Sequence, residues 1–327
     1  MSNVVEMTIV KAINAGLRRA MADNDKVLVF GQDVAELGGV FRVTEGLHAE
    51  FGQKRIFNSP IAEAGIVGTA IGLAMRGYRP VAEIQFDGFV FPAFNQITSQ
   101  LAKLQNRSEG FMTMPVVVRV PYGGGIGAIE HHSESPEAYF AHTPGLRVIS
   151  PSNPNDAYWM IQQAIKSEDP VLFFEPKRRY WQKGPVDLDN PPAGMHDAHI
   201  LRSGTDVTLV AYGPMVATAL QAAEIAATEG RSLEVIDIRS ISPIDYATII
   251  ESVKKTGHLI VTHEASVSVS VSSEIAARVA ELAFYHLEAP VIRVGGFDVP
   301  YPAAKLEEKF LPDADRILEA VDRSLGY

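Results

Sequence analysis

Glu63 is the residue in this sequence with the clearest potential for chemistry. It begins a segment in which small residues stand at Ala64, Gly68 and Gly72. A spacing of four places them on one helix face, where missing side chains let another backbone approach closely. A carboxyl group carried into such a contact leaves water and could share a proton with a bound base. The alternative is an ordinary acidic residue in a first helical turn, favoured by the helix dipole.

Two adjacent histidines, His131 and His132, end a glycine-rich loop that begins at Gly123. An imidazole that titrates near neutral pH can donate a hydrogen bond to a carboxylate or transfer a proton. A solvated histidine pair is the alternative. Metal binding by both is disfavoured, because adjacent side chains point in different directions and the sequence contains no Cys and no HExxH pattern.

The segment Gly123–Ala128 formally satisfies the G-x-G-x-x-A pattern of a dinucleotide-binding fold. The context does not fit that reading. An apolar helix should begin at once, whereas the polar run Glu130–Pro136 follows, and no acidic residue ends a second strand about 20 residues later. We therefore predict that these glycines let the loop pass close to a ligand or another subunit.

Short apolar strands alternate with helices along the chain, which predicts two open, mostly parallel α/β domains. The boundaries expected are 1–183 for the first domain, 184–204 for a linker rich in Pro, Gly, Asp and His, and 205–327 for the second. The predicted helices include Glu63–Met75, Phe89–Lys103 and Asn155–Lys166. In such sheets ligands bind beyond the carboxyl ends of strands, so the loops carrying Ile61, Phe89 and His132 should converge.

Bulk composition excludes several functional classes. The chain has 327 residues, a net charge of −10 and no cysteine. The negative charge argues against non-specific nucleic-acid binding and against a polybasic membrane patch. The lack of cysteine excludes a disulfide framework and a thiolate nucleophile. With no signal-peptide pattern and no apolar stretch of ~18 residues, we expect a cytoplasmic protein with no membrane span.

Several segments together resemble a known family. Glu63, Gly68 and Gly72 resemble the Glu-x4-Gly-Φ-x-x-Gly-Φ motif of thiamin diphosphate enzymes, with Thr69 as a departure. Over nearly the whole chain the sequence resembles the beta subunits of heterotetrameric 2-oxo acid dehydrogenases. The segments that carry this resemblance, in order, are Gly39–Gly46, Glu83–Phe86, His132–Ser135 and Leu287–Pro290.

The resemblance implies a pyrimidine-binding domain followed by a transketolase-like assembly domain. It implies that Glu63 binds the pyrimidine nitrogen of thiamin diphosphate, that Gln85 and Phe89 lie beside the aminopyrimidine, and that Ile61 lies under the bend of the cofactor. His132 would contact the 2-oxo acid substrate and assist acyl transfer to lipoamide. His142 also matches the family and is expected to support the loop. Position matching further implies a potassium ion at Val116, Val117, Ala164, Ser167 and Asp169.

The sequence lacks the Gly-Asp-Gly segment that normally helps to hold the metal and diphosphate in thiamin diphosphate enzymes. The chain therefore resembles half of an active site. A separate alpha subunit should supply the magnesium ion and the phosphate contacts, in an α2β2 heterotetramer that serves a dihydrolipoyl acyltransferase core.

Within the family, Glu175–Arg178 and Phe297–Pro302 resemble the branched-chain enzymes more than the pyruvate enzymes. The sequence therefore predicts the beta subunit of a branched-chain 2-oxo acid dehydrogenase. Pyruvate dehydrogenase is the first alternative and acetoin dehydrogenase a more distant one. A non-catalytic assembly subunit, which would tolerate loss of the Glu63 carboxylate, is the alternative from another class.

Overall fold

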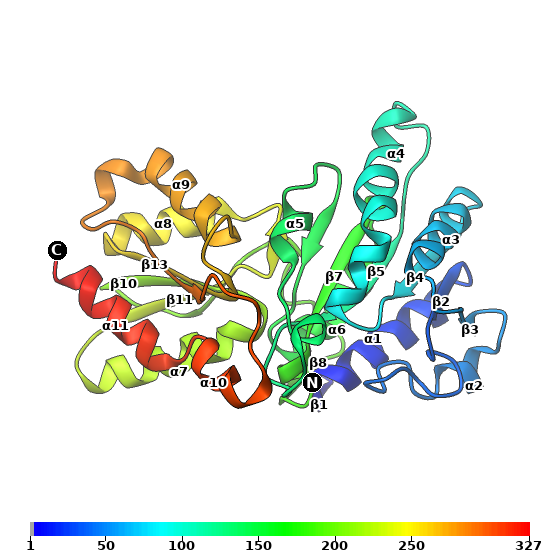
Figure 1. Cartoon of the computed structure of the whole chain (residues 1–327), viewed down its shortest axis with the longest axis horizontal. Helices are drawn as coiled ribbons and strands as arrows, with labels where there is room; N and C mark the ends of the chain where they lie inside the picture. The colour runs from blue at the N-terminus through cyan, green and yellow to red at the C-terminus, as the bar shows by residue number, and fades with distance from the viewer. Residues whose placement is uncertain (1–2) are drawn as a thin grey trace.

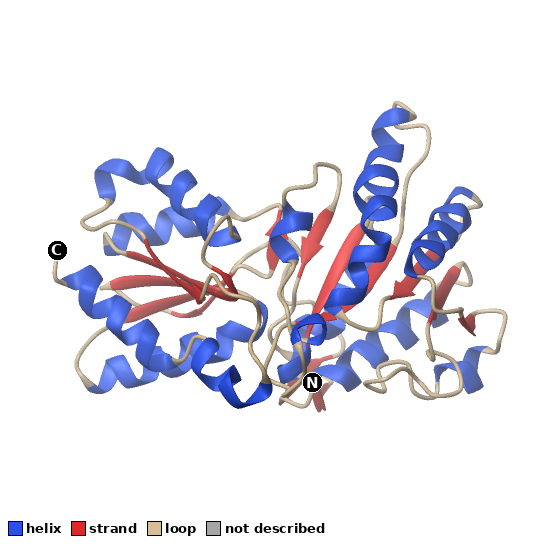
Figure 2. Ribbon diagram, in the orientation of Figure 1, coloured by secondary structure: helices blue, strands red, loops and turns tan. Residues whose placement is uncertain are grey.

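A seven-stranded sheet organises the first half of the chain in the computed structural model, which describes residues 3–327 (Figure 1, Figure 2). Its order is β12-β6-β7-β5-β4-β2-β3. Neighbours are parallel, except that β12 runs antiparallel to β6. The strands are β2 (Val27–Gly31), β3 (Ile56–Asn58), β4 (Arg79–Glu83), β5 (Val117–Tyr122), β6 (Arg147–Ile149), β7 (Val171–Pro176) and β12 (Ser240–Ser242).

Helices cover both faces of this sheet, which explains why its strands are apolar on both sides. On one face, buried residues of α1 and α6 share a hydrophobic cluster with Val117 and Phe173, and on the other, buried residues of α3 share a cluster with Val118 and Phe174. Thr8 caps α1 by accepting the Lys11 N–H at 3.3 Å. The helices are α1 (Ile9–Asp23), α2 (Leu47–Phe51), α3 (Glu63–Met75), α4 (Ala102–Arg107), α5 (Glu137–Ala141) and α6 (Pro154–Lys166).

The second half forms a five-stranded sheet of order β14-β13-β10-β11-β9, parallel except for the edge strand β9. Helices α7 and α11 cover one face, and α8 and α9 cover the other. Its strands are β9 (His199–Arg202), β10 (Val207–Ala211), β11 (Leu233–Asp237), β13 (Leu259–Ser266) and β14 (Ile292–Gly296). Its helices are α7 (Val216–Thr228), α8 (Tyr246–Thr256), α9 (Val271–Ala283), α10 (Glu307–Phe310) and α11 (Ala314–Leu325).

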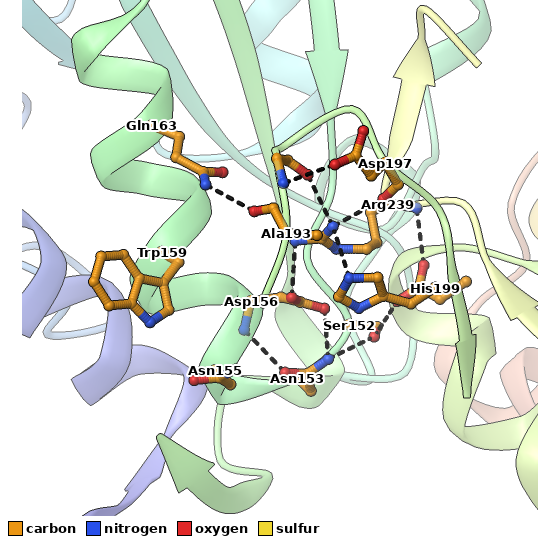
Figure 3. Close-up of polar contacts among 12 residues, drawn as sticks. Ser152, Asn153, Asn155, Asp156, Trp159, Gln163, Ala193, Asp197, His199 and Arg239 are labelled. Carbon is orange, nitrogen blue, oxygen red and sulfur yellow. Dashed lines mark hydrogen bonds and ion pairs between the residues drawn. The ribbon is translucent and has the colours of Figure 1, made fainter. Parts of the chain in front are cut away.

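The segment between the two sheets is held by neighbouring elements. Within it, β8 (Lys183–Asp187) pairs with β1 (Val4–Thr8). Arg239 is fully buried beside this segment, where it pairs with Asp156 at 2.9 Å and donates to the carbonyls of Gly194 and Asp197 at 3.0 and 2.8 Å (Figure 3). This guanidinium therefore fixes the connecting chain against α6.

One predicted element is wrong in type. The sequence predicted an α-helix over Phe89–Lys103. The chain instead forms a 3-10 helix, η1 (Asp87–Ala93), and a π-helix, η2 (Gln96–Leu101), before α4. Pro92 lies inside η1. Proline cannot donate a backbone hydrogen bond, so a regular α-helix is disfavoured there. This irregular segment carries Phe89 beyond the carboxyl end of β4.

Candidate active site

Glu63 is the first residue of α3, and its side chain is buried. Gln32, which directly follows β2, donates from Nε2 to Glu63 Oε1 at 3.1 Å. No hydrogen bond from residues 3–327 reaches Oε2 of this carboxylate. One oxygen is therefore held by the protein, and the other is available to a ligand. Sequence reasoning missed Gln32, although its place at a strand end was a usable signal.

Gln85 and Phe89 lie at the neighbouring strand end, after β4. Gln85 donates to the backbone carbonyl of Gln32 and to the Asp33 carboxylate, both at 3.3 Å. Gln32 thus connects Glu63 with Gln85. Elements α3 and η1 are in contact, which places these residues in one region. Ile61, on the loop before α3, is 84 % exposed and free to meet a ligand or a partner.

The small residues of α3 do not make the tight helix contact that the sequence suggested, at least within the described chain. Gly68 and Gly72 are exposed, and a Cβ atom at either position would find no other atom within 4 Å. Their face of α3 is therefore open to another chain.

His132 ends the short helix η3 (Glu130–His132) and packs on aromatic rings. Its imidazole centroid lies 4.1 Å from that of Phe86 and 5.1 Å from that of Phe89. Burial, followed by the neighbouring charge of His131, lowers the pKa of His132, so the neutral ring predominates at pH 7. Its Nδ1 is buried without a hydrogen-bond partner among the described residues.

The other two histidines differ from His132. His131 is more exposed and lies 3.4 Å from the Glu130 carboxylate. His142 is exposed at the end of α5, and its imidazole makes no hydrogen bond within residues 3–327, so its predicted support of the loop stays a prediction. It lines a cavity of about 1450 Å³ whose lining includes Ser133 and Glu134 but neither Glu63 nor His132.

Sequence reasoning also missed a buried ion pair beneath the His132 loop. Asp87, at the start of η1, pairs with Lys177, which follows β7, and neither side chain is exposed to solvent. Burial raises the pKa of Asp87 and lowers that of Lys177. Lys177 also donates to the backbone carbonyl of His132 at 2.6 Å.

Residues in the second half of the chain accept hydrogen bonds from the glycine-rich loop. Glu264 of β13 accepts the Gly124 N–H at 3.0 Å, and Glu307 of α10 accepts the N–H groups of Gly125 and Gly127 at 2.9 and 3.0 Å. Arg178 pairs with Glu264 at 2.6 Å. A dinucleotide-binding turn would lead directly into a long helix, whereas this loop leads into η3, which has three residues. The glycine-rich loop is therefore not such a turn.

Two family models match the two halves of the chain. The transketolase pyrimidine-binding domain matches residues 5–182, and the transketolase C-terminal domain matches residues 196–317. A pyruvate dehydrogenase E1 component subunit beta of Leifsonia xyli is 66 % identical, with 99 % of this chain and 96 % of that protein aligned. The chain belongs to the E1 beta subunits of 2-oxo acid dehydrogenases. This subunit family is part of the decarboxylase component, and the chain is therefore part of an enzyme.

Two further proteins are similar to this beta subunit. A 3-methyl-2-oxobutanoate dehydrogenase subunit beta of Mycobacterium tuberculosis is 53 % identical, with 98 % of this chain and 92 % of that protein aligned. A solved structure titled split gene transketolase, inactive beta4 tetramer, has a TM-score of 0.81 at 26 % identity and covers 98 % of both chains. The transketolase-like α/β fold predicted from the sequence is thereby confirmed.

E1 beta subunits pair with an alpha subunit, in a complex with an acyltransferase core. The residues of this beta subunit fit the pyrimidine half of thiamin diphosphate. Glu63 offers one free carboxylate oxygen, and Phe89 offers an aromatic ring on η1, which contacts α3. For magnesium, no cluster of three or more His, Asp or Glu side chains suited to a metal exists among residues 3–327.

The residues predicted to bind potassium lie close together, but several of their oxygens already make contacts within the protein. Val116 O accepts the Val171 N–H at 2.9 Å, and Ser167 O accepts from Arg79 at 3.0 Å. The Asp169 carboxylate pairs with Arg147 at 2.7 Å. Two arginines thus supply positive charge at this position, and potassium stays a prediction.

None of the helices in residues 3–327 has the length and apolar character needed to cross a membrane.

Proposed function

We propose that this chain is the beta subunit of a pyruvate dehydrogenase E1 component and works with its alpha subunit as an α2β2 heterotetramer. The observation that carries the substrate assignment is the 66 % identity with a relative of that name, against 53 % for the branched-chain relative. The proposal replaces the branched-chain preference predicted from Glu175–Arg178 and Phe297–Pro302. Two short segments weigh less than identity over 324 residues.

In this proposal Glu63 exchanges a proton with the pyrimidine nitrogen of thiamin diphosphate through its free oxygen. Gln32 keeps the other oxygen in place, which reduces the reorganisation needed at each proton transfer. Gln85 and Phe89 line the pyrimidine, and exposed Ile61 supports the cofactor from the loop before α3. Bound thiamin diphosphate supplies the electron sink for decarboxylation.

His132 is proposed to bind the carboxylate of the 2-oxo acid and then assist acyl transfer to the lipoyl group. Its neutral ring, packed on Phe86 and Phe89, carries one donor and one acceptor nitrogen. Only the protonated nitrogen can donate to a substrate carboxylate. Acyl transfer reduces the lipoyl disulfide: one sulfur takes the acyl group, the S–S bond breaks, and the other sulfur leaves as a thiolate. The N–H of the His132 ring can donate the proton that this thiolate needs, which is general-acid catalysis.

The alpha subunit is proposed to hold magnesium and the diphosphate, because this chain lacks the Gly-Asp-Gly segment. The related solved structure is named as an inactive beta4 tetramer, and we expect the same inactivity of this beta subunit alone.

The test is decarboxylation of pyruvate, 3-methyl-2-oxobutanoate and 4-methyl-2-oxopentanoate by the beta subunit alone and co-expressed with its alpha partner. We expect turnover only when both subunits are present, with the highest kcat/KM for pyruvate. Activity of the isolated chain would refute the proposal that the active site needs both subunits. A well-formed pair inactive on all three acids would refute catalysis and favour an assembly subunit.

The branched-chain enzyme is the second candidate, since the Mycobacterium tuberculosis relative covers nearly the whole chain. Highest kcat/KM for 3-methyl-2-oxobutanoate in the same assay would select it. A few methylenes in an apolar pocket change preference by about 1–3 kcal/mol, so the ranking should be measurable.

A further inference from the structure

Asp87 and Lys177 bridge two strand ends on either side of the loop that leads to His132. Asp87 follows β4 and Lys177 follows β7, and both strands neighbour β5 in the sheet. The glycine-rich loop leaves the sheet from the end of β5. The ion pair therefore lies across the base of this loop, and both of its side chains are fully buried.

Each member of the pair holds the backbone next to Ser133. Lys177 Nζ donates to the carbonyl of His132 at 2.6 Å, and Asp87 Oδ2 accepts the N–H of Glu134 at 2.8 Å. The carbonyl of Glu134 in turn accepts the N–H of Gly123 at 2.9 Å. The pair thus fixes the chain before and after Ser133, and Glu134 closes the loop onto its own start.

The aromatic contacts extend this fixation to the imidazole. Lys177 Nζ lies 5.4 Å from the centroid of the Phe86 ring, and the His132 ring packs on that same phenylalanine. Gly88, next to Asp87, lies so close to His131 that an added Cβ would collide with its backbone. The backbone and ring of His132 are therefore constrained from two sides.

Stability alone is a weak explanation for this pair. Removing two charges from water costs free energy that their attraction often fails to recover, and apolar replacements of buried ion pairs are frequently neutral or stabilising. By contrast, a lysine that also donates to a carbonyl at the end of η3 sets a position that apolar side chains cannot set, because they lack donors.

We propose that the Asp87–Lys177 ion pair is a positioning device that holds His132 in the orientation required for acyl transfer. The proposal rests on the proposed function of His132. It makes neither Asp87 nor Lys177 a catalytic residue, since they act through the histidine.

The test uses the co-expressed alpha–beta complex with three variants. Lys177→Met removes the donor, and Asp87→Asn combined with Lys177→Met avoids leaving an unpaired buried charge if the single variant fails to fold. Lys255→Met is the matched control, because Lys255 pairs with the buried carboxylate of Glu234 in the other half of the chain. Decarboxylation is measured with ferricyanide as electron acceptor, and acyl transfer by mass of an isolated lipoyl domain.

We expect acyl transfer to fall roughly 100-fold in both Lys177 variants and decarboxylation to fall about 3-fold or less, because a displacement near 1 Å is costly for a reacting group. The Lys255 control should match the parent in both steps. Equal losses in the two steps, or no loss in either, would overturn the proposal.

A second readout separates this proposal from the function on which it rests. Amide hydrogen exchange of residues 130–135 should accelerate in the Lys177 variants and stay unchanged in the control. Unchanged exchange would overturn positioning by the pair, whatever the activities. If His132→Ala transfers acyl groups normally, the proposed role of His132 is wrong, and the exchange result still shows whether the pair fixes the loop.

Discussion

At the residue scale, the pair formed by Glu63 and Gln32 is the main chemical feature of the site. The sequence predicted Glu63 from its place at the head of a helix with small residues. The place of Gln32 directly after a strand was a usable signal, but the sequence could not pair it with Glu63, which is 31 residues away and meets it only through the pairing of β2 with β3. The amide engages one carboxylate oxygen and leaves the second one free for the proposed proton transfer.

Glu63→Gln should preserve folding and remove most activity of the alpha–beta complex. The amide keeps the size of the side chain but cannot exchange the proton, so we expect kcat to fall roughly 100-fold or more. Steady-state decarboxylation and the circular dichroism spectrum measure the two halves of this prediction.

The control for Glu63→Gln is Glu224→Gln, the same change at an exposed position of α7. It should retain parental turnover. Near-normal activity of Glu63→Gln would refute the proton-transfer role and would fit a subunit used for assembly.

At the element scale, alternation of strands and helices was enough to predict both sheets and the loops that carry the site. The predicted helix over Glu63–Met75 agrees with α3. Apolar periodicity did not distinguish the irregular helices over 87–101 from an α-helix, since all of them bury residues at similar spacing. Long-range pairs such as Asp87 with Lys177 depend on strand order, which periodicity does not encode.

Glu307 provides a test of how the second half of the chain holds the glycine-rich loop. Its two oxygens accept N–H groups from Gly125 and Gly127, and Tyr301 also donates to it at 2.6 Å. Glu307→Gln leaves one acceptor oxygen for these donors. We expect the thermal unfolding midpoint of the complex to drop by about 2–6 °C, because hydrogen bonds to charged groups contribute about 1.5–3 kcal/mol.

Glu308→Gln is the control for Glu307, since Glu308 is exposed on the same short helix. It should leave the midpoint within about 1 °C, as surface substitutions usually do. If both variants behave alike, the contact between Glu307 and the loop contributes nothing measurable.

At the scale of the whole molecule, one hydrophobic core runs through both halves. It contains Val118 and Phe174 of the first sheet together with Val210 and Ile236 of the second. The sequence predicted two units but not this continuity, because it depends on how the sheets pack.

A buried carboxyl between the two sheets should make stability depend on pH. Glu137 of α5 accepts a hydrogen bond from Tyr212, next to β10, at 2.6 Å, and burial raises the pKa of Glu137 from 4.5 to about 7. The folded protein therefore holds this proton more tightly than the unfolded chain does. The resulting stabilisation is complete below pH 4.5 and is lost as the pH rises to about 7.

Glu137→Gln cannot titrate and should flatten this dependence. We expect the difference in unfolding free energy between variant and parent to change by at most about 1.4 kcal/mol per pH unit across this window, in favour of the variant as pH rises. Asp237, whose pKa burial also raises to about 7, titrates in both proteins and cancels in the difference. Thermal unfolding midpoints of the complex from pH 5 to pH 7.5 measure this difference between variant and parent, with Glu224→Gln as control. Parallel curves for Glu137→Gln and the parent would mean that Glu137 is already ionised in the folded protein, and that the junction between the sheets carries a buried charge.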